Sequence, residues 1–312
     1  MLREWIRISF SNDVRREIGT CINDKDKRFA CFYGMLLFSR VLSRERICFQ
    51  SESETTSEIF LSLFRSIFKK ELCCQENIRK NNVVLYTFEI CDREIIDEIF
   101  LKYRLEASER SINSEIIVNN SLGVFTAGVF LACGSVNNPN KEYHMEFTVP
   151  EKKLAKELSL LLSDIGVTSG TVMRRGQYIV YIKDSESIED TLTFIGAQQC
   201  TIELMNVKIY KDVRNKANRI ANCDAANIDK VVNAAMKQIE DIKLIDSVYG
   251  LDSISDDLKE VALLRLEHTD MSLQEIGECL SEPISRSGVS HRFKRISKIA
   301  EEIRVGSIKN ER

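Results

Sequence analysis

The chain has 312 residues, of which 44% are hydrophobic and 29% are charged, and its formal net charge is −3. This is the composition of an ordinary globular protein, and the length predicts two or three domains. The small net charge excludes a globally basic molecule, so any nucleic-acid site must be a local patch. The opening residues carry charges throughout, and no run of about 18 apolar residues occurs. We therefore expect neither a secretion signal nor a membrane span, and a cytoplasmic protein.

Periodic and alternating apolar residues predict a series of helices and strands along the first two thirds of the chain. The expected helices cover residues 27–42, 56–72, 93–105, 121–133, 151–165, 186–196 and 198–222. The expected strands cover residues 46–52, 83–90, 142–149, 171–173 and 177–183.

The spacing of these elements repeats along the chain. A strong strand begins 49 residues after Gly34, at Val83, and another begins 49 residues after Gly128, at Gln177. We interpret this as an internal duplication with halves of about 1–105 and 106–212, each ordered αββαββα, which form an α+β pseudo-dimer. A glycine inside a helix costs about 1 kcal/mol relative to alanine. Gly128 therefore predicts that two helices approach closely at the shared interface.

The segment that follows differs in character. Residues 213–245 contain no proline, no glycine and no strand pattern, which predicts a helical linker that is broken near Asn222–Asp224. The last segment, residues 246–312, is expected to be all-α, with Ser255 at the N-cap of its first helix. Ser272 and Glu275 have the spacing of a capping box for a second, short helix.

The end of the chain has the pattern of a helix-turn-helix. A turn follows the short helix, and a long helix is expected from about Ser287 to Arg304. In such modules the start of the second helix enters the major groove of DNA. Five cations and no acid lie between positions 286 and 298. The candidate DNA-binding residues are Arg286, Ser287, Ser290, His291, Arg292, Lys294, Arg295 and Lys298. The alternative is a solvated basic face on an ordinary helical bundle.

The ten cysteines and three histidines show no metal-ligand spacing. We therefore expect no metal and no cofactor, and we expect the cysteines to be small buried apolar residues. His144 and His291 support no arrangement of nucleophile, histidine and acid, so we expect no catalytic residues.

Four segments resemble the WhiA family of bacterial transcription regulators, which is linked to sporulation and cell division. They are YHMEFTVPEKKLAKELSLLLSDIG, YIVYIKDSESIEDTLTFIGA, NVKIYKDVRNKANRIANCDAAN and the stretch from SISDDLKEV to ISKIAEEIR. The resemblance covers nearly the whole chain. It implies a domain over residues 1–212 similar to LAGLIDADG homing endonucleases, followed by the linker and the helix-turn-helix. It also implies promoter DNA as the partner, contact with transcription machinery or a sigma factor, no membrane, and a location at the nucleoid.

In LAGLIDADG endonucleases an acid at the end of each motif helix holds Mg²⁺. When the motif is laid over residues 126–134, its aspartates become Leu131 and Cys133. Over residues 32–40 they become Leu37 and Ser39. Because Mg²⁺ prefers carboxylate ligands, the resemblance implies a DNA-binding regulator without nuclease activity. An active endonuclease targeted by the helix-turn-helix and a protein-interaction scaffold that binds no DNA are the alternatives.

Overall fold

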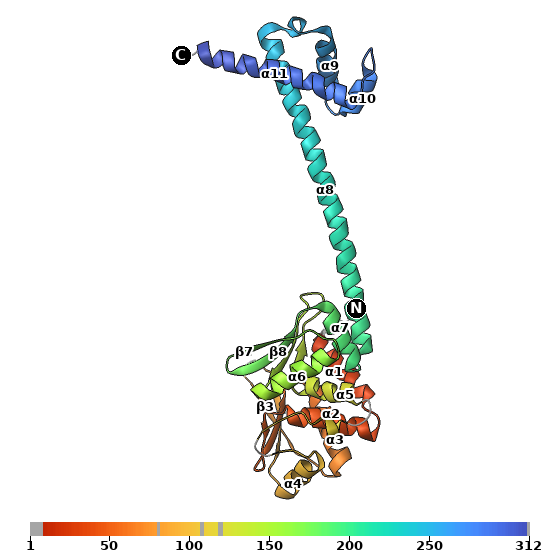
Figure 1. The fold of residues 1–312 in the computed structure, drawn as a ribbon, viewed down its shortest axis with the longest axis vertical. Coiled ribbons are helices and arrows are strands. Elements are labelled where there is room, and N and C mark those ends of the chain that lie inside the picture. The colour runs from red at the N-terminus through yellow and green to blue at the C-terminus, as the bar shows by residue number, and fades with distance from the viewer. Residues whose placement is uncertain (1–8, 80–81, 107–108, 118–120, 311–312) are drawn as a thin grey trace. The chain divides into compact units, whose positions relative to one another are not determined.

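The computed structural model describes residues 9–79, 82–106, 109–117 and 121–310. The chain divides into two compact units, Met1–Lys211 and Asp212–Arg312 (Figure 1).

The first unit repeats one order of elements twice. The first half contains α2 (Lys25–Leu37), β1 (Val41–Leu42), β2 (Ile47–Ser51), α3 (Glu54–Phe68), β3 (Cys74–Ile78), β4 (Val84–Ile90) and α4 (Arg93–Lys102). The second half contains α5 (Leu122–Cys133), β5 (Gly134–Val136), β6 (Met145–Val149), α6 (Lys152–Asp164), β7 (Gly170–Arg174), β8 (Gln177–Ile182) and α7 (Ser185–Phe194). A short 3₁₀ helix, η1 (Ser114–Ile116), lies between the halves. Each half is ordered αββαββα, which confirms the predicted duplication.

Each half forms a four-stranded antiparallel sheet. The strand orders are β1-β2-β4-β3 and β5-β6-β8-β7, so the two sheets have the same topology. In β6, Met145, Phe147 and Val149 are buried and alternate with half-buried residues. This period of two places one face of the sheet against the helices, and Figure 1 shows the helices of this unit beside the two sheets.

Helices α2 and α5 pack against each other through their backbones. A Cβ atom built on Gly34 would lie 2.3 Å from the carbonyl oxygen of Phe125, and one on Gly128 would lie 2.1 Å from that of Cys31. Neither position has room for a side chain, which confirms the close approach expected from Gly128. Both helices are buried over most of their length, because they form the centre of the shared core.

An unexpected helix, α1 (Phe10–Cys21), precedes the first half. It buries Phe10, Val14 and Ile18, whose spacing of four is the sequence signal for this helix. The Ser11 hydroxyl accepts a hydrogen bond from the Val136 amide at 2.7 Å and donates one to the Val136 carbonyl at 2.9 Å. Helix α1 is thereby joined to strand β5 of the second half.

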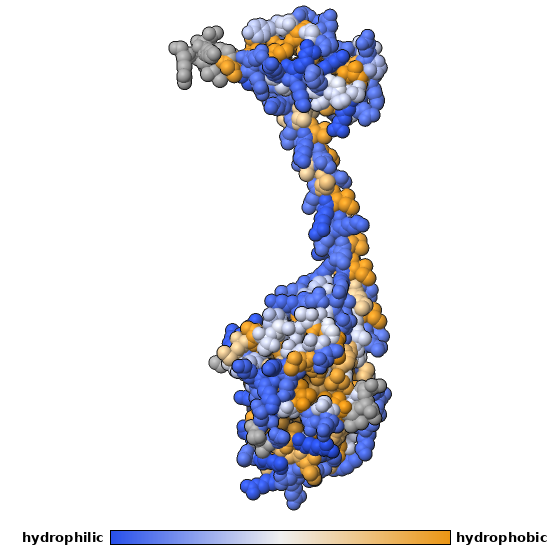
Figure 2. Space-filling model, viewed as in Figure 1, coloured by the Kyte–Doolittle hydropathy of each residue, from blue (hydrophilic) through white to orange (hydrophobic). Residues whose placement is uncertain are grey.

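Helix α8 (Gln198–Tyr249) runs without interruption, so the break expected near Asn222–Asp224 is wrong. Asparagine and aspartate disfavour a helix by less than about 1 kcal/mol each, and neither proline nor glycine is present to end it. The Glu17 carboxylate of α1 accepts the amides of Gln199 and Cys200 at 2.6 and 3.0 Å and so satisfies two free donors at the helix start. Apolar side chains are exposed along α8, Ile209 and Ile228 among them, and Figure 2 shows hydrophobic surface along this helix.

The second unit is all-α. Its further elements are η2 (Leu251–Ser253), α9 (Asp256–Glu267), α10 (Leu273–Cys279) and α11 (Arg286–Asn310). They share a core with Ile242 and Ile245 of α8, both fully buried. The last turns of the segment expected to be a linker, residues 213–245, therefore pack with the helix-turn-helix.

The helix ends of this unit follow the expected local chemistry. The capping box is confirmed, since the Ser272 amide donates to Glu275 at 2.7 Å and the Glu275 amide donates to the Ser272 hydroxyl at 3.3 Å. Ser255 occupies the N-cap position of α9 but makes no side-chain capping bond.

The expectation that the cysteines are buried is wrong for half of them. Cys31, Cys48 and Cys200 are buried, whereas five are exposed. The exposed ones are Cys21, Cys73, Cys91, Cys223 and Cys279. Among the described residues, no helix combines the length and apolarity needed to cross a membrane.

Candidate nucleic-acid interface

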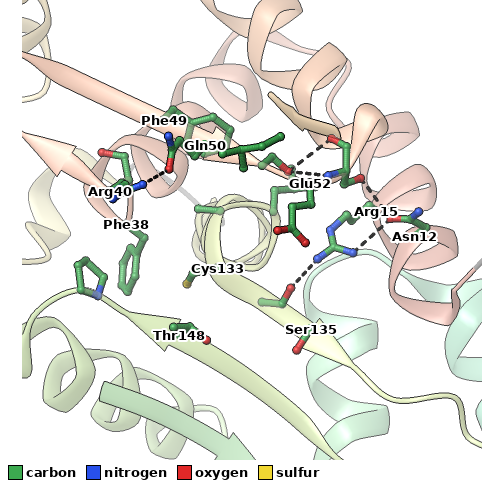
Figure 3. A pocket seen from close by; sticks show the side chains of 18 of the residues that line it. Asn12, Arg15, Phe38, Arg40, Phe49, Gln50, Glu52, Cys133, Ser135 and Thr148 are labelled. Atoms are coloured by element: carbon green, nitrogen blue, oxygen red, sulfur yellow. Dashed lines mark hydrogen bonds between the residues drawn. The ribbon is translucent and has the colours of Figure 1, made fainter. Parts of the chain in front are cut away.

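A groove of about 960 Å³ lies in the first unit where α2 and α5 end (Figure 3). Ser39 and Cys133, at the positions of the endonuclease acids, both line it. The Ser39 hydroxyl donates to the Val41 carbonyl at 3.2 Å, and the Cys133 thiol donates to the Val129 carbonyl at 3.3 Å. Burial raises the pKa of Cys133 well above that of an ordinary thiol. Both groups are thus occupied by their own backbone and stay neutral.

The other two overlaid positions are structural. Leu37 and Leu131 are 1% and 2% exposed, and both belong to the hydrophobic core.

Arginine side chains supply most of the charge in this groove. Arg15 of α1 donates to the Gly134 carbonyl at 2.7 Å, and its guanidinium lies 5.6 Å from the centroid of the Phe130 ring. Burial lowers the pKa of Arg15. Arg40 and Arg79 also line the groove, where Glu52 is the one carboxylate among the lining residues. Arg79 pairs with Glu52 at 2.6 Å.

Sequence reasoning missed Arg15 because α1 was not expected. Among the residues that the structure describes, no three His, Cys, Asp or Glu side chains converge in a way that could hold a metal ion.

In the second unit the turn between α10 and α11 closes tightly on the short helix. The Ile284 amide donates to the Gly277 carbonyl at 3.1 Å, and a Cβ on Gly277 would lie 2.4 Å from the Ile284 carbonyl oxygen. Helix α11 then buries Val289, Phe293 and Ile296 against the core. These contacts fix which face of α11 is turned to solvent.

The candidate DNA-binding residues fall into three groups around α11. Arg286, Ser287, His291, Lys294 and Lys298 are exposed, and the last four share the face opposite the buried stripe. The structure brings these residues together as one surface.

Arg292 and Arg295 form the second group, because both turn toward Asp257 of α9. Arg295 lies 3.0 Å from a carboxylate oxygen of Asp257, and Arg292 donates to its carbonyl at 3.3 Å. The Ser255 hydroxyl and then the two arginines hold the pKa of Asp257 below its ordinary value.

Ser290 forms the third group, turned toward α8. It lines a second groove, of about 370 Å³, between α8 and α11. Lys237 of α8 lines the same groove together with Lys294 and Lys298. No sequence pattern indicated Lys237, because it lies about 50 residues from the predicted site and only the fold brings it there.

Buried polar groups hold α11 in place against α8 and α9. The Asp241 carboxylate of α8 is fully buried, accepts the Ser297 hydroxyl at 2.5 Å, and pairs with Arg304 at 2.7 Å. Arg265 of α9, 2% exposed, donates to Gln238 of α8 at 3.1 Å and lies over the Phe293 ring of α11 at 5.5 Å.

Residues 122–214 match a family model described as the WhiA LAGLIDADG-like domain, and residues 217–300 match the WhiA C-terminal HTH domain. A Clostridium beijerinckii protein named "Probable cell division protein WhiA" is 36% identical over 318 residues, which cover 95% of this chain and 99% of that protein. The chain belongs to the WhiA family. A Clostridium tetani WhiA protein of the same name is 41% identical over 235 residues, 73% of each chain.

The fold agrees with this WhiA membership. A solved structure described as "Crystal structure of full-length DUF199/WhiA from Thermatoga maritima" aligns with a TM-score of 0.57 at 24% identity. The alignment covers 95% of this chain and 99% of that one. The α+β fold with a LAGLIDADG-like domain, the helix-turn-helix and the WhiA resemblance are therefore confirmed.

Proposed function

We propose that this WhiA-family protein is a sequence-specific DNA-binding transcription regulator, linked to cell division and sporulation, that reads DNA with α11. The observation that carries the proposal is the outward face of α11, where Ser287, His291, Lys294 and Lys298 lie together on the second helix of a helix-turn-helix. The names of the relatives, which call them cell division proteins, support the biological link.

The roles within the site follow from chemistry and position. Ser287 and His291 lie near the start of α11, where side chains reach base edges, and Ser290 lies beside them on the side that faces α8. Arg286, Lys294 and Lys298 are exposed cations suited to phosphates or to guanine. Arg292 and Arg295 can contact DNA only after they release Asp257, so we expect them to contribute less to DNA affinity than the exposed cations. In this proposal residues 1–212 are a scaffold, and α8 connects them to the helix-turn-helix. The partners are promoter DNA and transcription machinery such as a sigma factor, and the protein acts at the nucleoid.

We propose further that the LAGLIDADG-like unit does not cleave DNA. Metal-dependent phosphodiester cleavage needs a cluster of oxygen ligands that carries negative charge. The groove offers Glu52, already paired with Arg79, while Arg15 places positive charge at the end of α5. These residues do not suit Mg²⁺.

Supercoiled plasmid incubated with the protein and Mg²⁺ or Mn²⁺ tests the nuclease proposal. We expect no nicking beyond that of a buffer control. Nicking that survives purification and disappears in a Glu52→Gln variant would establish the endonuclease alternative.

The DNA-binding proposal is tested by mapping bound genomic fragments and measuring affinity for an enriched fragment and a scrambled duplex. His291→Ala should reduce the preference for the enriched fragment by roughly tenfold, the value of one base contact. Lys243→Ala, an exposed cation on α8 away from the second groove, is the matched control and should change nothing. The protein-scaffold alternative holds if wild-type protein binds neither duplex. It also holds if DNA binding and its salt dependence are unchanged both in the Arg292→Ala, Arg295→Ala double variant and in His291→Ala.

A further inference from the structure

The groove between α8 and α11 has walls made largely of hydrogen-bond donors. Three lysines line it, Lys237 from α8 and Lys294 and Lys298 from α11, against one acid, Glu301. Ala234 and Phe293 are its apolar lining residues. The groove therefore has an excess of positive charge beside an apolar surface.

The neutral groups in the groove also favour an anion. Gln238 uses its side-chain oxygen to accept from Arg265 at 3.1 Å, which leaves its Nε2 amide, a pure donor, for another partner. The Ser290 hydroxyl adds a further donor. An incoming anion would thus meet ammonium, amide and hydroxyl groups together.

The lysines differ from the arginines on the other side of α11. Arg292 and Arg295 are engaged by Asp257. Among the described residues, no ion pair joins Lys237, Lys294 or Lys298 to a carboxylate. Binding an anion in this groove breaks no existing ion pair, whereas recruiting the arginines breaks two.

We infer that the groove between α8 and α11 holds a backbone phosphate of duplex DNA, and that Lys237 of α8 is a DNA-contacting residue outside the two motif helices α10 and α11. The inference rests on the proposed function, since it requires α11 to lie in the major groove. A strand that passes along the α8 side of α11 then places its phosphates over Ser290, Lys294 and Lys298, and Lys237 closes the other wall. The Asp241 carboxylate holds the two walls together through Ser297 and Arg304.

Phosphate contact and base contact have different signatures. Loss of a lysine that contacts a phosphate weakens binding to every sequence alike and reduces the magnitude of the slope of log affinity against log salt by about 0.9. Lys237→Ala should therefore reduce affinity for the enriched and the scrambled duplex by the same factor, about threefold to tenfold at moderate salt. Lys237→Glu should reduce it more, and Lys237→Arg should retain most of it. Lys243→Ala, on the same helix outside the groove, is the control.

The measurement is fluorescence anisotropy of the full chain on both duplexes at several salt concentrations, with circular dichroism to verify folding. The inference is overturned if both Lys237→Ala and Lys237→Glu leave the affinity and the salt slope unchanged. In that case a loss of sequence preference in His291→Ala would still support the proposed function. A loss confined to the enriched duplex would also overturn it, because it would assign Lys237 to base recognition. If wild-type protein binds neither duplex, the proposed function itself fails.

Discussion

Substitution of Gly128 by alanine tests the contact at the centre of the first unit. A Cβ at this position would lie 2.1 Å from the Cys31 carbonyl oxygen, whereas real Cβ contacts under 3.0 Å essentially never occur. The obstacle is the backbone of α2, which cannot rotate away as a side chain could. Helices α2 and α5 must therefore separate by about 1 Å within a close-packed interior.

The free-energy cost follows from that displacement. Forcing one extra carbon into a packed core costs about 1–3 kcal/mol, and a gap of 0.5–1 Å forfeits about a quarter to a half of each dispersion contact beside it. The gain in helix propensity from alanine is about 1 kcal/mol. Because both helices are buried over most of their length, we expect the loss of packing to exceed this gain and the net destabilisation to be about 1–2 kcal/mol.

Urea unfolding of the full chain, followed by far-ultraviolet circular dichroism, measures this change. Gly19→Ala is the matched control, because its Cβ would meet only the end of the flexible Ile59 side chain, at 3.0 Å. The Gly34→Ala and Gly128→Ala pair should be less than additive, since either one already separates the helices. A Gly128→Ala variant as stable as wild type, or more stable, would refute the reasoning that backbone contact defines this interface.

Three further predictions concern Asp241 and Asp257 in the second unit. Asp241→Ala removes the acceptor of two donors on α11 and should destabilise this unit by about 2 kcal/mol. Hydrogen exchange of the α11 amides measures this loss of stability. Equal exchange rates in Asp241→Ala and in the exposed control Asp246→Ala would contradict the prediction. Asp257→Asn removes the carboxylate charge beside Arg292 and Arg295 while keeping the backbone carbonyl that Arg292 contacts. It should raise DNA affinity and steepen the slope of log affinity against log salt by about 1 to 2; an unchanged slope would show that the carboxylate does not restrain the arginines. The hydrogen bond from Ser255 and the two arginines lower the folded-state pKa of Asp257, so its stabilisation is present above the unfolded-state pKa of about 4 and is lost as the pH falls through the lower folded value. Unfolding as a function of pH should accordingly show a shallower acid loss in Asp257→Asn than in wild type.

Much of the fold could be predicted from the sequence because its signals are local. The strands and helices of each half repeat at a constant spacing, and Gly128 together with Gly34 predicts the close contact of two helices at the shared interface. Helix α1 escaped notice because Phe10, Val14 and Ile18 stand in a mostly polar segment. The break predicted in α8 is absent because Asn222 and Asp224 only weakly disfavour a helix, and the segment has no proline or glycine to end it.

The candidate site was predicted only in part. The charge pattern of the sequence identifies the cations on α11, but it does not show which of them are free to contact DNA and which are held in ion pairs. Arg292 and Arg295 depend on Asp257, which lies on another helix.

The amino-acid sequence alone determines the order of the elements, the capping box at α10 and the absence of carboxylates at positions 37, 39, 131 and 133, because these depend on residue identity and on neighbours within a few positions. The tertiary structure decides which charges are free and which are paired. It brings Arg15 to the end of α5, Lys237 to the side of α11, and Asp241 beneath it, since ionic and hydrogen-bonding partners act over a few ångströms in space and these residues are distant along the chain.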